Sequence, residues 1–109
     1  AASLPFGTQK RVEMSRALAA NPKLILLDEP ASGLSHEELQ GVAQVIQSIC
    51  HDLNVTVLLV EHNMDLVMSI SDRVCVLNFG RKLADGTPDE VRSNPSVIEA
   101  YLGAPDAQR

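Results

Sequence analysis

Short, mainly apolar runs constrain the fold of this chain more than any other feature. Three segments have the length and composition of a buried strand: 24–27 (LILL), 55–60 (VTVLLV) and 73–78 (RVCVLN). A strand that is apolar throughout, instead of alternating with polar residues, needs cover on both faces. Segments with helical spacing separate the runs, so the sequence predicts an α/β fold with parallel strands flanked by helices.

Helical spacing and cap signals predict the elements between these runs. Apolar side chains predict a helix over 7–20, which Asn21-Pro22 ends. Ser35 is a suitable N-cap for a long helix with Glu37 and Glu38 in its first turn. Turn and cap signals predict the remaining elements, which are a short helix over 63–70, a ribbon around Gly80 and Gly86, a helix from a Thr87 cap to Arg92, and a last helix over 97–102.

Composition and charge narrow the class of protein. A length of 109 residues allows one domain at most. A net charge of −5, without a basic run, argues against nucleic-acid binding. No apolar run approaches the roughly 20 residues that span a bilayer, so we expect no direct membrane insertion. Cys50 and Cys75 lie far apart in sequence and form no metal-binding pair, which is typical of reduced thiols in a cytoplasmic protein.

Acidic and imidazole side chains follow two of the predicted strands. Asp28-Glu29 ends the first run and Glu61-His62 ends the second. Ligands of parallel α/β sheets bind beyond the carboxyl ends of the strands, so both pairs are expected to face one crevice. The alternative is that polar residues follow strands only because the chain leaves the core there.

The residue types at these strand ends suit hydrolysis of a nucleotide. Mg²⁺ is held by one or two carboxylates together with waters and substrate phosphates. One acid of the Asp28-Glu29 pair would reach the hydration shell of the metal, and the other would orient or deprotonate a water. His62 would hydrogen-bond a terminal phosphate or the developing charge.

The sequence holds no phosphate-binding loop of the form GxxxxGK[ST]. The residues that follow Lys10, Lys23 and Lys82 are arginine or leucine, never serine or threonine. Either the phosphate site is completed elsewhere, or the nucleotide hypothesis is wrong.

The order of the motifs resembles that of ATP-binding cassette (ABC) ATPases over essentially all of residues 1–109. LPFGTQKRVEMSRALAA (4–20), followed by Asn21-Pro22, is similar to the signature motif with its helix, and LILLDE (24–29) to the Walker B strand with its following glutamate. SGLS (32–35) looks like the D-loop and EHN (61–63) like the switch-histidine loop. The ribbon and helices over 78–102 resemble the end of the ATP-binding subunits of branched-chain amino acid importers.

This resemblance implies a fold and a set of residue roles. The fold would be a C-terminal, partial P-loop NTPase-like three-layer domain that lacks the P-loop strand. Glu29 would be the catalytic base, His62 would contact the γ-phosphate, and Asp28 would bind Mg²⁺. The residues that would contact ATP in the signature and D-loop are Leu4, Phe6, Gly7, Thr8, Gln9, Ser32 and Gly33.

The signature stretch departs from the family's usual Leu-Ser-Gly-Gly-Gln. Pro5 stands where a serine hydroxyl would bond the γ-phosphate, and proline also lacks an N–H. An aromatic residue such as Phe6 is familiar at the third position in importer-like members. Gly7 remains near the helix start, where free N–H groups and the helix dipole favour phosphate.

The resemblance also implies a function, with partners and a location. The parent protein would be the MgATP-hydrolysing subunit of an importer, with branched-chain or related amino acids as cargo. It would pair with a second ATPase subunit and with transmembrane permease subunits, peripherally at the cytoplasmic face of the membrane. The start at Ala1 looks like a truncation before the signature, so the chain alone is expected to be inactive.

Alternatives to this function remain open. The parent protein could serve another importer or be a non-transport ABC ATPase. The chain as it stands could be a nucleotide-free interaction module, since loss of the P-loop strand would expose a sheet edge and apolar surface that favour dimerisation. Gly33 could equally be a plain turn glycine, and Glu61 could simply orient His62 or cap the next helix.

Overall fold

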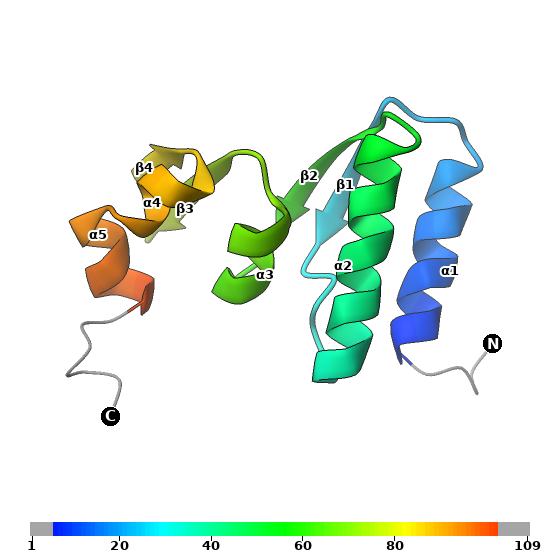
Figure 1. Cartoon of the computed structure of the whole chain (residues 1–109), viewed down its shortest axis with the longest axis horizontal. Coiled ribbons are helices and arrows are strands. Elements are labelled where there is room, and N and C mark those ends of the chain that lie inside the picture. The colour runs from blue at the N-terminus through cyan, green and yellow to red at the C-terminus, as the bar shows by residue number, and fades with distance from the viewer. Residues whose placement is uncertain (1–5, 103–109) are drawn as a thin grey trace. The chain divides into compact units, whose positions relative to one another are not determined.

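The computed structural model describes residues 6–102 of the chain, and the surroundings of side chains from Gly7 to Tyr101. Where the sequence suggests a single domain, this part of the chain divides between Asn63 and Met64 into two compact units. Figure 1 shows their elements in order along the chain.

The first unit alternates helices and strands as the sequence predicts. Its elements are α1 (Phe6–Leu18), β1 (Leu24–Asp28), α2 (His36–His51) and β2 (Thr56–Val60). Helix α1 ends two residues earlier than predicted, before Asn21, whose left-handed φ of 55° reverses the chain. Ser35 caps α2 as expected, with its hydroxyl bonded to the backbone N–H of Glu38.

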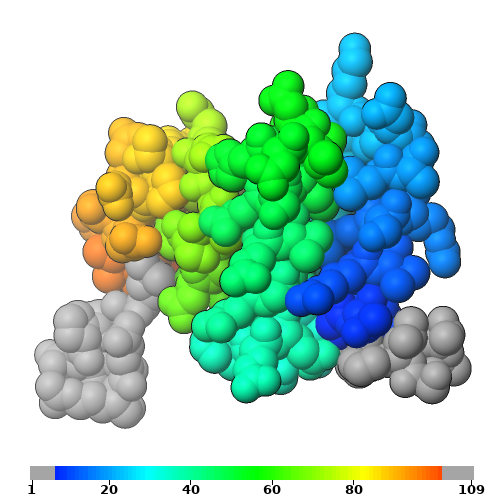
Figure 2. Space-filling model, turned by 45° about the vertical axis from the view of Figure 1, so that its right-hand side comes forward, coloured from blue at the N-terminus to red at the C-terminus, as the bar shows by residue number. Residues whose placement is uncertain are grey.

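The two strands of this unit confirm the predicted parallel pairing. β1 and β2 pair in register from Leu24 with Thr56 to Asp28 with Val60. Both helices run back alongside the strands, and Figure 2 shows α1 in blue packed against α2 in cyan and green. The buried apolar side chains that form the core of this unit are Met14, Ile25, Val42, Ile46, Ile49 and Val55.

The prediction that both faces of these strands are covered is wrong for the residues described. Leu24 and Leu26 of β1, with their neighbours Leu58 and Val60 of β2, are between 51% and 67% exposed. Alternation of side chains places the four on one face and buried Ile25 on the other. An apolar strand indicates a need for cover, but the covering layer has to come from other segments, and residues 6–102 supply it on one face only.

The second unit is built around an antiparallel hairpin. Its elements are α3 (Met64–Ile70), β3 (Val74–Asn78), β4 (Arg81–Gly86), α4 (Pro88–Arg92), α5 (Pro95–Val97) and a π-helical turn (Ile98–Leu102). β3 pairs with β4 in a separate two-stranded sheet, which corrects the prediction of a third parallel strand. Phe79 and Gly80 both have positive φ (49° and 76°), as a type I′ hairpin turn requires.

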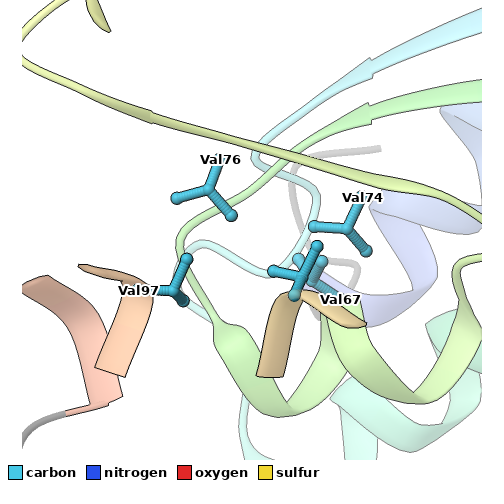
Figure 3. Close-up of a cluster of buried hydrophobic side chains, with 5 residues drawn as sticks. Val67, Val74, Val76 and Val97 are labelled. Atoms are coloured by element: carbon cyan, nitrogen blue, oxygen red, sulfur yellow. The ribbon is translucent and has the colours of Figure 1, made fainter. Parts of the chain in front are cut away.

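Valine side chains form the core of the second unit. Figure 3 shows Val67 of α3 and Val97 of α5 packed against Val74 and Val76 of β3. Val91 completes this cluster. Thr87 caps α4 in the same way that Ser35 caps α2, with Glu90 as the reciprocal partner. No helix within residues 6–102 is both long and apolar enough to cross a bilayer.

Candidate functional site

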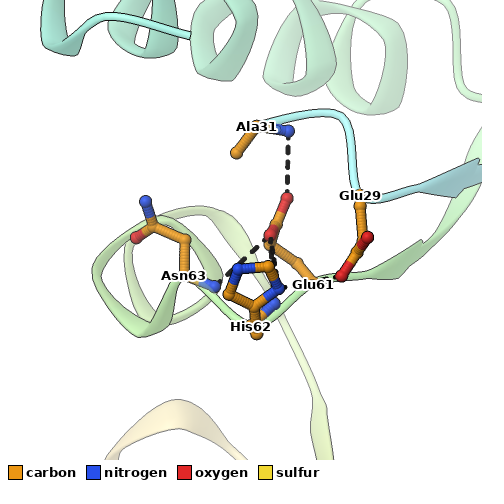
Figure 4. Close-up of polar contacts among 5 residues, drawn as sticks. All are labelled: Glu29, Ala31, Glu61, His62 and Asn63. Atoms are coloured by element: carbon orange, nitrogen blue, oxygen red, sulfur yellow. Dashed lines mark hydrogen bonds and ion pairs between the residues drawn. The ribbon is translucent and has the colours of Figure 1, made fainter. Parts of the chain in front are cut away.

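A carboxylate–imidazole pair lies where the two parallel strands end. The Glu29 N–H donates to the carbonyl of Val60 at 2.7 Å, so the segments that follow β1 and β2 leave the sheet side by side. His62 Nδ1 then lies 2.8 Å from Glu29 Oε1 (Figure 4). Both side chains remain open to solvent, at 73% exposure for His62 and 49% for Glu29. The pair is therefore accessible to a ligand.

The backbone of Glu29 is strained. Its φ of 49° lies in the left-handed region, which costs a residue with a side chain about 1–2 kcal/mol. Such strain persists where the surroundings enforce it, and it concentrates at functional sites. The hydrogen bonds to Val60 and His62 hold Glu29 in this conformation.

Asp28 is the last residue of β1 and is exposed at the tip of the strand. No cluster of three or more His, Cys, Asp or Glu side chains able to hold a metal ion occurs in the part of the chain that the structure describes. An exposed carboxylate beside Glu29 fits Mg²⁺, which takes one or two protein carboxylates and fills its remaining positions with water and phosphate. It does not fit a closed, all-protein metal site.

The loop after β1 contains two further predicted site residues. Ser32 donates its N–H to the carbonyl of Glu29 at 3.1 Å, and Gly33 has a φ of 77°. Both residues are exposed. The left-handed conformation accounts for glycine at position 33 whether or not this loop contacts a partner.

The predicted signature residues begin α1. Leu4 and Pro5 lie outside the described residues, as does the side chain of Phe6. Thr8 is exposed and Gln9 is half-buried. Figure 1 shows the arrowheads of β1 and β2 pointing toward the end of the unit at which α1 begins.

The Gly7 N–H, expected to be free for phosphate, is bonded within the unit. It donates to Glu38 Oε2 at 2.8 Å, while Glu38 Oε1 accepts from the Ser35 N–H at 3.0 Å. Hydrogen bonds from the backbone of Ser35, the backbone of Gly7 and the Ser35 hydroxyl lower the pKa of the Glu38 carboxyl. In this structure the Glu38 carboxylate therefore binds the N–H group at the start of α1 that the sequence predicts to bind phosphate.

Sequence reasoning missed the hydrogen bond between Gly7 and Glu38 and left the role of Glu61 open. The spacing of Ser35 and Glu38 is that of a capping box, but it carries no signal for the contact with Gly7, 31 positions away. For Glu61, the sequence leaves open a direct role, orientation of His62 and capping of the next helix. Its side chain is 1% exposed and accepts hydrogen bonds from Ala31, His62 and Asn63.

Comparison with known proteins gives consistent relatives. A family model described as a branched-chain amino acid ATP-binding cassette transporter matches residues 81–107. The chain is 50% identical over 103 residues to the high-affinity branched-chain amino acid transport ATP-binding protein BraF of Pseudomonas aeruginosa, and 47% identical to LivG of Escherichia coli. Each match covers 94% of this chain, which spans 40% of the length of either relative.

Solved structures show the same fold. An ATP-binding cassette of an ABC transporter in its ADP conformation matches 94% of this chain with a TM-score of 0.81 and 32% identity. A nucleotide-free ATP-binding cassette matches the same share with a TM-score of 0.81 and 31% identity. This chain covers 41% and 42% of those structures.

The fold defines the class of this protein, a partial P-loop NTPase fold of the ATP-binding cassette type. The predicted α/β class with parallel strands and helices is confirmed. The chain corresponds to part of an ABC transporter ATP-binding subunit. It is close to the branched-chain amino acid transport ATP-binding proteins, at about 48% identity.

Proposed function

We propose that this chain is the part of an importer's ATP-binding subunit that carries its catalytic base. The observation that carries the proposal is the 2.8 Å contact between Glu29 and His62 at the ends of two parallel strands. Two relatives at 47% to 50% identity are branched-chain amino acid transport ATP-binding proteins, which supports these or related amino acids as cargo. The lipopolysaccharide export protein LptB of Escherichia coli is less similar, at 38% identity.

The geometry suits in-line hydrolysis of ATP. Water attacks the γ-phosphorus, its proton passes to the Glu29 carboxylate, and the bond to the bridging oxygen breaks to release ADP. His62 Nδ1 contacts Glu29 Oε1, which leaves Glu29 Oε2 for the water and His62 Nε2 for a γ-phosphate oxygen. Asp28 would bind Mg²⁺, which neutralises charge on the phosphates when present.

The start of α1 and the loop after β1 would serve a second subunit. In this proposal the signature residues Leu4, Phe6, Gly7, Thr8 and Gln9, with Ser32 and Gly33, line nucleotide bound mainly by that subunit. ATP closes the pair of subunits and hydrolysis reopens it, moving permease partners while the ATPase stays peripheral at the cytoplasmic face of the membrane. Glu38 would have to release or share the Gly7 N–H for phosphate to bind there.

The catalytic role of Glu29 is tested by Glu29→Gln in the complete subunit. Glutamine keeps the shape of the side chain but does not accept the proton, so we expect steady-state ATP hydrolysis to fall at least about 100-fold. MgATP affinity should change less than threefold, because the phosphates are bound by other groups. Glu37→Gln, on the exposed first turn of α2, is the matched control and should retain full activity. Unchanged turnover in Glu29→Gln would remove Glu29 from the mechanism.

The 109-residue chain by itself should neither hydrolyse ATP nor bind it tightly. Its sequence holds no GxxxxGK[ST] loop, whose backbone N–H groups and lysine bind the β- and γ-phosphates in P-loop NTPases. Titration calorimetry with MgATP should show no binding at micromolar concentrations, and phosphate release should equal the buffer rate. Micromolar affinity would show that the chain holds a phosphate site of a different kind.

A further inference from the structure

Glu61 is a carboxylate whose side chain is almost completely buried, at 1% exposure. Oε2 accepts from the Ala31 N–H at 3.0 Å. Oε1 accepts from the N–H of His62 at 3.0 Å and of Asn63 at 3.3 Å. Figure 4 shows the carboxylate between these backbone groups, and the mechanism proposed above does not use it.

These three hydrogen bonds join two loops that are far apart in sequence. Ala31 belongs to the loop after β1, two residues beyond Glu29, and lies 30 positions before Glu61. His62 and Asn63 belong to the loop after β2. Each loop therefore carries one member of the Glu29–His62 pair, and Glu61 connects the two loops at a second point beside that pair.

We propose that Glu61 is a positioning residue, which holds the loops after β1 and β2 at the spacing that brings Glu29 and His62 together. The inference rests on the function proposed above and assigns Glu61 no direct contact with the nucleotide. Glu29 and His62 are 49% and 73% exposed, so little packing restrains them. The buried carboxylate of Glu61 adds a restraint on the two loops, beyond the Glu29–Val60 and Glu29–His62 hydrogen bonds.

The position needs a carboxylate of this length. Both oxygens of Glu61 act as acceptors, whereas a glutamine amide has one acceptor oxygen and presents N–H groups at its other end. In Glu61→Gln the oxygen can keep the His62 and Asn63 bonds, and the amide then faces the Ala31 N–H, donor against donor. In Glu61→Asp the side chain is one methylene shorter, so the link across the loops is lost while the charge remains.

The test measures Glu61→Gln and Glu61→Asp in the complete subunit. We expect kcat for ATP hydrolysis to fall about tenfold in each, which corresponds to loss of one hydrogen bond to a charged group. KM for MgATP should stay within twofold, because Glu61 contacts no phosphate. Amide exchange at Ala31 should accelerate in both variants, and this readout does not depend on activity.

Two comparisons separate a positioning role from general destabilisation. Glu90→Gln weakens a comparable carboxylate-to-backbone bond, to Thr87 in the other compact unit, and should leave kcat unchanged. In a Glu29→Gln background, Glu61→Gln should lower kcat by less than a further twofold. Glu61 acts through the Glu29–His62 pair, which Glu29→Gln already disables.

The outcomes distinguish this inference from the proposed function. If Glu29→Gln abolishes turnover while both Glu61 variants keep kcat within twofold, Glu61 is not a positioning residue and the proposed function stands. A fall in kcat that Glu90→Gln reproduces also overturns the inference. If Glu29→Gln retains full turnover, the proposed function itself fails. Should Glu61→Gln not fold, Glu61→Asp and the Ala31 exchange rate decide.

Discussion

Gly7 and Gly41 both lie in helices against a neighbouring side chain. Substitution by alanine should nevertheless change the stability of the protein in opposite directions at the two positions. A Cβ added at Gly41 would meet Nη2 at the end of the Arg11 side chain. Arg11 is exposed and its guanidinium can swing away, so Gly41→Ala should stabilise the protein by roughly 0.5–1 kcal/mol through helix propensity. Thermal unfolding measures this change.

At Gly7 the added Cβ meets atoms of Glu38 that cannot move independently. Oε2 lies at 3.0 Å and the Cβ of Glu38 at 3.2 Å, so relief requires the whole residue to shift. Gly7→Ala should therefore weaken the bond between the Gly7 N–H and Glu38 and lower the melting temperature. A melting temperature equal to or above the parent's would show that this approach of α1 to α2 is not tight.

At the scale of elements, two helix caps depend on ionised carboxyl groups. Hydrogen bonds from the Thr87 backbone and then from its hydroxyl lower the pKa of Glu90, as those from Ser35 and Gly7 lower the pKa of Glu38. A carboxyl whose pKa is lower when folded contributes stability above its unfolded pKa, and this is lost as pH falls through the folded pKa. The melting temperature should therefore be constant near neutral pH and fall from about pH 5 downward.

Variants assign this acid dependence to the caps. Glu38→Gln removes one titrating group, so its melting temperature should start lower at pH 7 and fall less steeply with acid than the parent's. Glu37→Gln, which removes an exposed carboxylate outside the capping box, should leave the slope nearly unchanged. Parallel curves for the parent and Glu38→Gln would contradict the assignment.

At the scale of the whole molecule, the exposed face of β1 and β2 should make the 109-residue chain self-associate. Leu26 and Leu58 are paired neighbours on this face, and an uncovered apolar strand pair favours association. Sedimentation should show dimers or larger species at high concentration. Leu26→Thr with Leu58→Thr should shift the chain toward monomer while keeping residues that suit strands.

A control separates this face from exposed leucines in general. Leu53, in the loop after α2, is 57% exposed, as Leu58 is. Leu53→Thr should leave association unchanged. If the unsubstituted 109-residue chain is monomeric at high concentration, the predicted self-association is wrong. The hypothesis of an interaction module then loses its support.

Local signals in the sequence predicted most elements and part of the site. Apolar runs, the Ser35 and Thr87 caps and the turn glycines are properties of a few neighbouring residues, so the helices and strands formed close to where they were expected. The expected approach of Glu29 to His62 followed from one assumption, that the two strands are parallel. The structure shows that pairing and a hydrogen bond between the two side chains.

Sequence alone therefore determined which segments are helices and strands and where their polar ends lie, because period and cap chemistry depend on near neighbours. Tertiary structure decided which groups meet: Glu38 with Gly7, Glu61 with Ala31, and β3 with β4. It also decided that one face of β1 and β2 stays exposed. The first two contacts join residues 30 or 31 positions apart, and a short sequence pattern carries no record of contacts over that distance. The third lies within a hairpin, where the apolar run of β3 does not show whether its partner strand is parallel or antiparallel.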